Sequence, residues 1–358
     1  MSSTSKIRVG VVGASGYGGL ELLRLLSFHP DVQVTYAAGS QERDGTVADM
    51  YPFLSTYSHL QLEKYDVDRC ADRCDAVFVA LPSGASGAIA GQLHERGRLA
   101  IDLSGDLRLP ADTYASWYQK PPVAPKVIAQ AVYGLTEWNR NEIRGASLIA
   151  NPGCYATAVL LGLLPAVKAK LAAPDRPLIV DAKSGVSGAG RSATLGGQLG
   201  ELSDNFYPYR VGKHQHTPEI ERYLAQFGLA EKSNEASHPP IVFTTQLLPA
   251  IRGIYASCYI PLGADVQVEQ VVDIYRTTYE GEPFIRIHDP GKYPELKHVR
   301  GSNQTHIGLF VDNRTATLQV FSALDNLQKG AAGQALQNFN VAMGLDQTTG
   351  LSQLPIYP

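Results

Sequence analysis

The sequence has no long apolar run, no excess of charge of one sign and little cysteine. Lys and Arg together number 31 and Asp and Glu number 34, so the formal net charge of the 358 residues is −3, with both signs spread along the chain. A nucleic-acid-binding surface needs clustered Lys and Arg, so nothing indicates that class of protein. No window carries about 18 uninterrupted apolar residues, which argues against a membrane-spanning helix.

The N-terminus lacks the features of a secretion signal. Residues 1–6 are polar and lead directly into a strand-like segment, without a basic region, a long apolar core or a cleavage site. We therefore expect a cytoplasmic protein that binds neither a membrane nor nucleic acid.

Cysteine occurs only four times. Cys70 and Cys74 are four residues apart, but no second Cys or His pair lies near them to complete a zinc site, so we expect ordinary reduced thiols and no metal. Cys258 lies in an apolar, strand-like run and is expected to be a small buried residue. Cys154 has a different context, which is described below.

What the sequence does contain is an ordinary globular composition, with 44% apolar and 18% charged residues. Its length exceeds what one simple core holds, so two domains are expected. The first 150 residues alternate between predicted strands (7–12, 32–38, 76–81 and 99–103) and predicted helices (20–28 and 86–96). This alternation predicts a parallel sheet with helices on both faces.

The pattern changes after residue 173. Five strand candidates follow with fewer helices between them, at residues 178–182, 241–247, 253–260, 305–311 and 315–323. Helices are predicted at 268–279 and, after Asp325-Asn326, at 327–343, and surface loops at 120–126 and 230–240. The fold class predicted for the whole chain is therefore α/β in the first part, followed by an α+β part with a mainly antiparallel sheet.

The glycine-rich run Gly13-Ala14-Ser15-Gly16-Tyr17-Gly18-Gly19 directly follows the first predicted strand and opens a helix. Backbone N–H groups at such a helix start bind the phosphates of a dinucleotide, and Gly permits close approach. The spacing differs from the common G-x-G-x-x-G, and a plain strand-to-helix turn is the alternative. The position of the run favours a dinucleotide site.

The end of the second predicted strand bears on the choice of cofactor. Ser40 and Arg43 suit the 2′-phosphate of NADP, whereas Glu42 would suit the ribose hydroxyl of NAD. The residues favour NADP.

Cys154 follows Asn151-Pro152-Gly153 and precedes a helical run, so its sulfur lies in the first turn of a predicted helix. The helix dipole and the free N–H groups there favour a thiolate, which attacks acyl carbons. A buried cysteine at a helix start is the alternative, and position alone does not decide between the two.

Two histidines, His214 and His216, precede a helix predicted to begin at Thr217-Pro218. An imidazole is the usual proton-transfer group near neutral pH, and Glu219 could orient one of the rings or simply favour the helix dipole. Structural histidines are the alternative. We lean to His214 as the proton carrier, but the sequence leaves the choice open.

The segment from Lys183 to Arg191 combines hydroxyl groups, glycines and two cations. Such a segment suits an anionic substrate, although it would also make a flexible loop.

Together these residues resemble the N-acetyl-gamma-glutamyl-phosphate reductase family of arginine biosynthesis, almost from end to end. The matching motifs are Gly13 to Gly19, Ile101-Asp-Leu-Ser-Gly-Asp-Leu-Arg108, Tyr133-Gly-Leu135, Asn151-Pro-Gly-Cys-Tyr-Ala-Thr157, Ser184-Gly-Val-Ser-Gly-Ala-Gly-Arg191, His214-x-His216-x-Pro-Glu219 and Asp325-Asn-Leu-x-Lys-Gly-Ala-Ala-Gly-Gln334. Ser83, where the family often has His, and Thr136, where it often has Pro, depart from the pattern at the edge of the cofactor pocket.

The resemblance implies a fold like that of aspartate-semialdehyde and glyceraldehyde-3-phosphate dehydrogenases. It implies a discontinuous Rossmann-type NADP-binding domain of residues 1–153 and 325–358, and an α+β catalytic and dimerisation domain of residues 154–324. Cys154 matches the nucleophile, and His214, His216 and Glu219 match the acid–base region. Further cofactor contacts are implied at Ser184, Gly185 and Asn326, and substrate contacts at Ser104, Arg108, Asn151, Lys183, Ser187, Arg191 and Arg252.

The implied reaction is the NADPH-dependent reduction of an acyl phosphate to a semialdehyde through a Cys154 thioester. The sister reductase of lysine biosynthesis is the nearest alternative, but its carrier protein would need a basic collar that the sequence does not indicate. Aspartate-semialdehyde dehydrogenase fits the double-histidine segment poorly, and a non-catalytic NADPH-binding regulator would not need the acid–base segment. We expect a homodimer or homotetramer.

Overall fold

The computed structural model describes residues 6–39, 45–228 and 240–357. The chain divides into two compact units, one formed by Met1–Gly153 with Ala331–Gln353 and the other by Cys154–Gly330 with Leu354–Pro358. Residues 325–330 and 354–358 therefore belong to the second unit. Among the described residues, no helix is both long and apolar enough to span a membrane.

The first unit is built on a seven-stranded sheet in the order β3-β2-β1-β4-β5-β7-β6, with every strand pair parallel. Its strands are β1 (Ile7–Val12), β2 (Val32–Gly39), β3 (Leu62–Lys64), β4 (Ala76–Val79), β5 (Leu99–Asp102), β6 (Val132–Tyr133) and β7 (Leu148–Ala150). All residues of β4 and β5 are buried, as expected where helices cover both faces of a parallel sheet. The predicted parallel sheet is confirmed.

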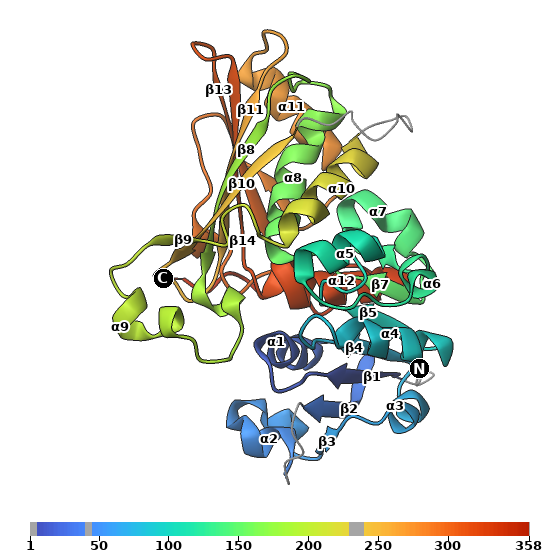
Figure 1. The fold of residues 1–358 in the computed structure, drawn as a ribbon. Helices are drawn as coiled ribbons and strands as arrows, with labels where there is room; N and C mark the ends of the chain where they lie inside the picture. The colour runs from blue at the N-terminus through green and yellow to red at the C-terminus, as the bar shows by residue number, and fades with distance from the viewer. Residues whose placement is uncertain (1–5, 40–44, 229–239, 358) are drawn as a thin grey trace. The chain divides into compact units, whose positions relative to one another are not determined.

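The helices of this unit include one from the far end of the chain. They are α1 (Tyr17–Leu26), α2 (Val47–Met50), α3 (Val67–Arg73), α4 (Ser86–Glu95), α5 (Ala111–Tyr118), α6 (Pro125–Ile128), α7 (Thr136–Ile143) and α12 (Gly333–Ala342), with the 3₁₀ turn η1 (Pro52–Tyr57). On α12, drawn in red in Figure 1, Phe339 packs against Phe78 of β4 with ring centroids 5.7 Å apart. The C-terminal helix thus completes the core of the N-terminal sheet.

The second unit is built on a mixed sheet in the order β12-β13-β14-β11-β8-β10-β9. Its strands are β8 (Leu178–Gly185), β9 (Tyr207–Tyr209), β10 (Ile241–Leu248), β11 (Ile254–Pro261), β12 (Ile285–Ile287), β13 (Thr305–Asp312) and β14 (Thr317–Leu324). Four pairs are antiparallel, and the pairs β12–β13 and β8–β10 are parallel. The prediction of a mainly antiparallel sheet is confirmed.

Three helices pack on the second sheet and on each other: α8 (Cys154–Lys168), α10 (His216–Gly228) and α11 (Val268–Thr278). The side chains facing them are apolar and buried, including Val180, Cys258 and Val320. The opposite side of the sheet carries Ile179, Val242 and Phe310, which are 43%, 50% and 41% exposed. We call this side the open face.

Short elements complete the second unit: the 3₁₀ turns η2 (Val186–Ala189), η3 (Leu195–Gly197) and η4 (Leu296–His298), the helix α9 (Leu199–Leu202) and the π-helical turn η5 (Gln328–Ala332), whose last two residues belong to the first unit. The single helix predicted at 327–343 is therefore wrong in detail, because η5 precedes α12. The loop predicted at 120–126 ends in the first turn of α6, and all but Pro240 of the loop predicted at 230–240 lies outside the described residues.

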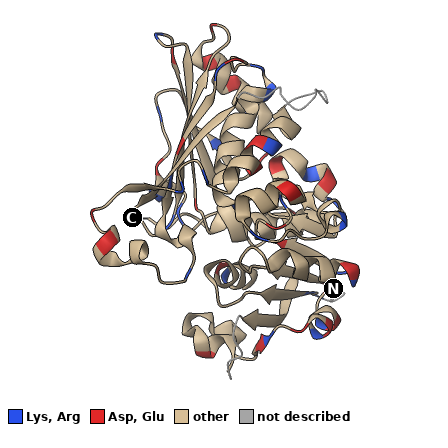
Figure 2. Cartoon of the chain, in the orientation of Figure 1, with Lys and Arg blue, Asp and Glu red and all other residues tan. Residues whose placement is uncertain are grey.

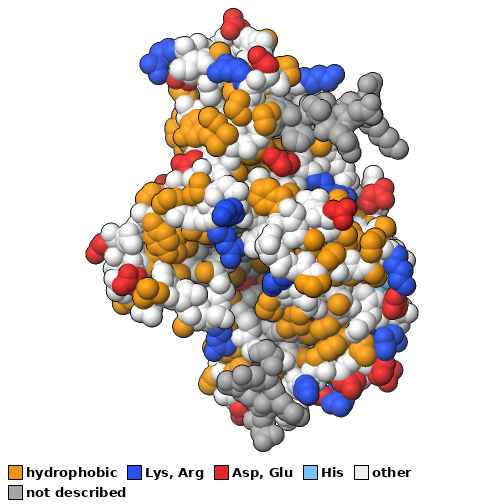
Figure 3. Space-filling view, viewed as in Figure 1, with side chains coloured by type: hydrophobic (Ala, Val, Ile, Leu, Met, Phe, Trp, Pro, Cys, Tyr) orange, Lys and Arg blue, Asp and Glu red, His pale blue; other side chains and the backbone are white. Residues whose placement is uncertain are grey.

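Charged residues of both signs are scattered along the described part of each unit (Figure 2). On the face drawn in Figure 3, Lys and Arg alternate with Asp and Glu and with apolar side chains, and no broad basic patch is present among the described residues there. This distribution agrees with the net charge of −3.

Candidate active site

The glycine turn between β1 and α1 is tight for steric reasons. Gly13 has φ +92°, and a Cβ there would lie 2.4 Å from the carbonyl oxygen of Ala80. A Cβ on Gly19 would lie 2.2 Å from the oxygen of Gly13. Only glycine fits these two positions, which bring the start of α1 against the carboxyl end of β1.

The start of α1 is suited to an anion. Gly16 is its N-cap and provides no side-chain cap. A Cβ on Gly16 would meet nothing nearer than the oxygen of Gly13, at 3.5 Å, so space is open beside the helix start. Uncapped N–H groups at the start of a helix are donors for a diphosphate. Ser40 and Arg43, predicted to select NADP, lie outside the described residues.

A buried polar network lies at the carboxyl end of β5. Ser86 donates to Oδ1 of Asp102 at 2.6 Å, and the hydroxyl of Ser104 donates to Oδ2 at 2.9 Å. Burial raises the pKa of the Asp102 carboxyl to about 6, although the hydrogen bonds from both serines lower it. Ser104, a predicted substrate residue, is thus engaged inside the first unit.

Arg108 and Asn151, also predicted to bind substrate, hold the backbone at the ends of β5 and β7. The buried guanidinium of Arg108 donates to the carbonyl oxygens of Asn151 and Leu103, both at 2.8 Å. The amide of Asn151 donates to the oxygen of Ala331 at 3.1 Å and accepts from Asn338 at 3.0 Å. These contacts fix the Asn-Pro-Gly turn that precedes Cys154.

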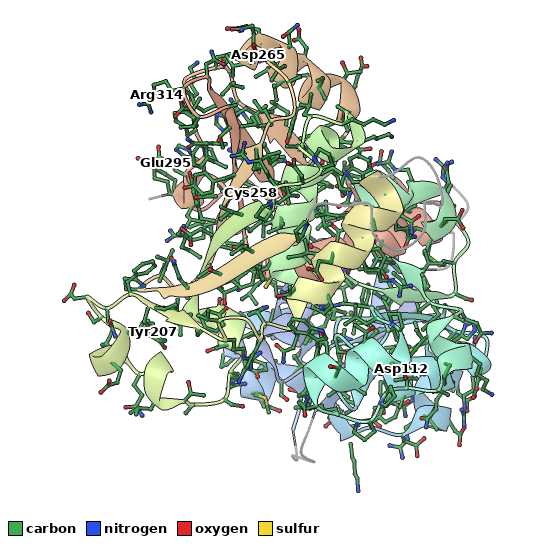
Figure 4. The ribbon with its side chains drawn as sticks, turned by 45° about the horizontal axis from the view of Figure 1, so that its top comes forward. Asp112, Tyr207, Cys258, Asp265, Glu295 and Arg314 are labelled. Carbon is green, nitrogen blue, oxygen red and sulfur yellow. The ribbon has the colours of Figure 1, made fainter. Side chains whose placement is uncertain are left out.

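Cys154 is the first residue of α8, and its side chain is partly exposed. The other three cysteines are completely buried. Figure 4 shows one of them, Cys258, in the interior of the second unit, which confirms the prediction of a buried strand cysteine. The remainder of α8, up to Val167, is buried, so the position of its first turn is set by core packing. The dipole of this helix favours a thiolate at Cys154.

Tyr155, the next residue, is part of a chain of hydroxyl groups. Tyr209 of β9 donates to the Tyr155 hydroxyl at 2.9 Å, and Tyr155 donates to the carbonyl oxygen of Gln246 at 3.3 Å. Burial raises the pKa of Tyr209 to about 12 and that of Tyr155 further. Both phenols therefore remain protonated at neutral pH, and the sequence interpretation assigned them no role.

His214 and His216 lie against the ring of Tyr155. The ring centroid of Tyr155 is 5.3 Å from that of His214 and 6.0 Å from that of His216, and the two imidazoles are 4.9 Å apart. The structure thus brings both predicted acid–base residues to the side chain that follows Cys154. Because β9 and β10 supply Tyr209 and Phe243 to the same ring cluster, the histidine segment is held on several sides.

The two histidines have different surroundings. His214 is 5% exposed, and burial, followed by the charges of His216 and Arg210, lowers its pKa to about 2. Its Nδ1 accepts the backbone N–H of His216 at 3.2 Å. His216 is half-buried and is the first residue of α10. Glu219 is fully buried in the first turn of α10, and its charge opposes the lowering of the His214 pKa.

The segment from Lys183 to Arg191 is more ordered than a flexible loop. Lys183 and Ser184 belong to β8, and the Lys183 ammonium is bound to the carboxylate of Asp181. Ser184 and Ser187 are buried, and residues 188–191, which include Arg191, are exposed. A Cβ on Gly185 would lie 2.8 Å from the backbone of Ile251, so this glycine serves close strand packing.

Arg252 and Asn326 are engaged with neighbouring segments of the second unit. Nε of Arg252 lies 2.9 Å from Oδ2 of the fully buried Asp325. The side chain of Asn326 accepts from the backbone of Gly253 at 2.7 Å and donates to Ser187 at 3.0 Å. The predicted roles of these residues in binding stay predictions.

Known proteins resemble the chain over nearly its whole length. Residues 8–146 match a semialdehyde dehydrogenase NAD-binding domain model, and residues 154–326 match a semialdehyde dehydrogenase dimerisation domain model. N-acetyl-gamma-glutamyl-phosphate reductase from Geobacillus stearothermophilus is 47% identical over 98% of this chain and 100% of its own length. The protein of the same name from Oceanobacillus iheyensis is 40% identical over 98% and 99%.

The chain belongs to the N-acetyl-gamma-glutamyl-phosphate reductase family. The resemblance stated from the motifs is thereby confirmed, and the lysine-pathway alternative is not favoured. The fold of this family member is that of the semialdehyde dehydrogenases. Aspartate semialdehyde dehydrogenase II from Vibrio cholerae, complexed with ASA, superimposes with a TM-score of 0.71 at 17% identity, over 94% of this chain and 98% of its own. The NADP complex of the Candida albicans enzyme gives the same values.

Membership of this family settles two coarse points. An NAD(P)-binding domain is present, and so is a domain of the dimerisation type. Beyond these, the structure adds Tyr155, Tyr209, Asp325 and Gly330, to which the sequence interpretation gave no role of their own. Tyr155, Asp325 and Gly330 lie in the matched motifs, whereas Tyr209 lies in none of them.

Proposed function

We propose that this chain is an NADP-dependent oxidoreductase that reduces N-acetyl-gamma-glutamyl phosphate to N-acetylglutamate semialdehyde and phosphate, in arginine biosynthesis. The observation that carries the proposal is the partly exposed Cys154 in the first turn of a buried helix, with two histidines against the next side chain. A thiolate at this position can attack the acyl carbon, expel phosphate and form a thioester.

The protein groups around Cys154 have distinct tasks in this proposal. N–H groups at the start of α8 stabilise the oxyanion that forms when the thiolate attacks the acyl carbon. NADPH, when bound, supplies the hydride that reduces the thioester. In the biosynthetic direction a histidine protonates the alkoxide left by hydride transfer. The thiohemiacetal would then return this proton to the histidine as its C–S bond breaks, which releases the semialdehyde and the Cys154 thiolate.

We assign the proton transfer to His216 in place of His214, to which the sequence interpretation leaned. His214 is almost fully buried, and a pKa near 2 keeps it neutral throughout the physiological range. Its Nδ1 already accepts a backbone N–H, so it suits the role of a neutral support for the His216 segment. His216 is the more exposed ring, and Glu219 remains the candidate for an orienting group.

For the cofactor, we propose that the uncapped start of α1 binds the diphosphate of NADPH. Ser40 and Arg43 would select the 2′-phosphate, which favours NADP over NAD. In this proposal the first unit, which includes α12, is the NADP-binding domain. Ser184, Gly185 and Asn326 remain predicted cofactor residues, and Arg191 is the exposed cation of the predicted substrate segment.

We further propose a homodimer in which a second copy covers the open face of the second sheet. Ile179, Val242 and Phe310 leave apolar surface exposed there, beside the Lys183–Asp181 ion pair. Ile179 and Val242 are direct partners on neighbouring strands, and exposed apolar side chains on one face of a sheet are typical of an interaction site. Light scattering on the purified chain should give twice the monomer mass, and a monomer would contradict the proposal.

The reverse reaction tests the function most directly. Purified protein should reduce NADP in the presence of N-acetylglutamate semialdehyde and inorganic phosphate, and the rate should vanish without phosphate. Aspartate semialdehyde, assayed separately under the same conditions, serves as the comparison substrate. Equal or faster turnover of aspartate semialdehyde, or turnover that does not depend on phosphate, would contradict the proposed substrate.

A further inference from the structure

Gly330 leaves no room for a side chain because Cys154 occupies the space. A Cβ built on Gly330 would lie 2.8 Å from the Cβ of Cys154 and 3.2 Å from its Cα. A contact below 3.0 Å requires movement, and here the opposing atoms belong to the backbone and the first side-chain carbon of Cys154. Neither can rotate away. The backbone of η5 is therefore a direct support for the first residue of α8.

The position of Gly330 is in turn set by Asp325. The N–H of Gly330 donates to the carbonyl oxygen of Asp325 at 2.9 Å. Oδ1 of the Asp325 carboxylate accepts the N–H groups of Leu327 at 2.8 Å and Gln328 at 3.1 Å, where η5 begins. A carboxylate that accepts backbone N–H groups orders the turn that follows it, because charge-assisted hydrogen bonds are short and strong.

Asp325 is itself held from two other segments. Its Oδ2 accepts the N–H of Gly301 at 2.7 Å and lies 2.9 Å from Nε of Arg252. The Asp325 side chain is 0% exposed and that of Arg252 is 19% exposed, so the pair is largely shielded from water. An uncompensated carboxylate would be costly in this environment, and the ion pair therefore keeps Asp325 in one position.

We propose that Asp325 and Gly330 are positioning residues that hold Cys154 in the geometry required for attack on the acyl phosphate. This inference rests on the proposed role of Cys154 as nucleophile. The chain of contacts runs from Arg252 to the Asp325 carboxylate, through the π-helical turn to Gly330, and from there to the Cβ of Cys154. π-Helical turns occur often at functional sites. Asp325 and Gly330 act through Cys154, and neither is among the predicted substrate residues.

The first test is Gly330→Ala. We expect kcat to fall by about 100-fold, because a displacement of about 1 Å at the reacting atom has an effect of that order. The Kd of NADPH and the KM of the acyl phosphate should stay at their wild-type values. Alkylation of Cys154 by iodoacetamide reports its position and ionisation independently of turnover, since the other three cysteines are buried. In Gly330→Ala, both the rate of this alkylation and its dependence on pH should differ from the wild type.

Gly162→Ala is the matched control on the same helix. A Cβ at Gly162 would lie 3.5 Å from side-chain atoms of Ser322 and Val320, which is ordinary van der Waals contact. This variant should retain wild-type kcat and wild-type alkylation. Asp325→Asn is the second test, because it keeps the shape of the side chain but loses the charge and one acceptor. It should lower kcat and alter the alkylation profile without raising KM.

A double-mutant comparison tests the contact itself. The loss of thermal stability caused by Gly330→Ala should be smaller in a Cys154→Gly background, where the opposing Cβ is absent. Equal losses in both backgrounds would overturn the proposed contact. If Gly330→Ala does not fold, Asp325→Asn becomes the deciding variant. A wild-type kcat in Asp325→Asn, or a change in its KM alone, would overturn the proposal.

Failure of this inference can be separated from failure of the proposed function. An active Cys154→Ser enzyme would overturn the proposed function. An inactive Cys154→Ser enzyme together with fully active Gly330→Ala and Asp325→Asn enzymes would overturn only the positioning role.

Discussion

Two helix starts in this molecule follow parallel strands, yet they offer different chemistry. α1 follows β1 through a turn at Gly13 that packs against Gly19 of the helix, and its N-cap is a glycine. α8 follows β7 through the Asn151 turn and begins with Cys154. The first start presents only backbone N–H groups, whereas the second presents a nucleophile in the same electrostatic setting. Changes at the first should therefore affect cofactor affinity, and changes at the second should affect the chemical step.

The largest expected effect is that of Cys154→Ser. Removal of a catalytic nucleophile lowers kcat by on the order of 10⁴-fold or more. Because the start of α1 is untouched, the Kd of NADPH, measured by fluorescence titration, should remain at the wild-type value. A variant that retains turnover would remove the distinction between the two helix starts.

His216→Ala comes next. Loss of a proton-transfer group lowers kcat by about 10²–10⁴-fold, and one limb of the pH–rate profile should flatten. His214→Gln should lower kcat less and keep both limbs, because His214 stays neutral in the wild-type protein. If only the His214 variant loses a limb, the assignment of the two histidines must be reversed.

At the other helix start, Gly16→Val should weaken cofactor binding without affecting the fold. Gly16 has φ −86°, which valine adopts, and the space beside its α-carbon is open. Loss of the helix-start interaction, about 2 kcal/mol, corresponds to roughly a thirtyfold rise in Kd. Turnover at saturating NADPH should persist, and Gly16→Ala should have a smaller effect. Loss of kcat with an unchanged Kd would contradict a diphosphate site here.

The smallest effect concerns stability in mild acid. The pKa of His214 is lower in the folded protein than in the unfolded chain, so the unfolded state binds the proton more readily. The stability from this group is fully present above pH about 6.5 and is lost progressively as the pH falls towards 2. Between pH 7 and 5 the loss amounts to about 2 kcal/mol.

His214→Phe removes this titration while keeping a ring for the contacts with Tyr155 and Phe243. The free energy of unfolding, measured in urea at both pH values, should therefore fall less in the variant than in the wild type. If the free energy of unfolding falls equally in the two proteins, His214 is accessible to protons in the folded state.

Local patterns were sufficient to predict the elements that carry the site. The Asn-Pro-Gly turn followed by an apolar helical run predicted the start of α8 at Cys154, and Thr217-Pro218 placed the start of α10 to within one residue. Both depend on residues adjacent in the chain. The Lys183–Asp181 ion pair could also have been predicted, because residues two apart on a strand share a face.

The surroundings of the histidines could not be predicted, because they come from distant segments. The burial of His214 depends on Tyr209 and Phe243, which belong to two other strands of the sheet. The resemblance implied that Arg108 contacts the substrate, and this role stays a prediction. The hydrogen bonds from its guanidinium to Asn151 and Leu103 could not be predicted, because they depend on how β5 and β7 are paired.

The C-terminal helix α12 has a consequence for the order in which the protein assembles during synthesis. Phe339 and Asn340 fill positions in the N-terminal unit, where they contact Phe78 and His29. The ribosome makes these residues after all strands of both sheets. The nascent second unit therefore has every strand available while the first still lacks part of its core. We expect the first unit to need protection from aggregation until α12 has been made.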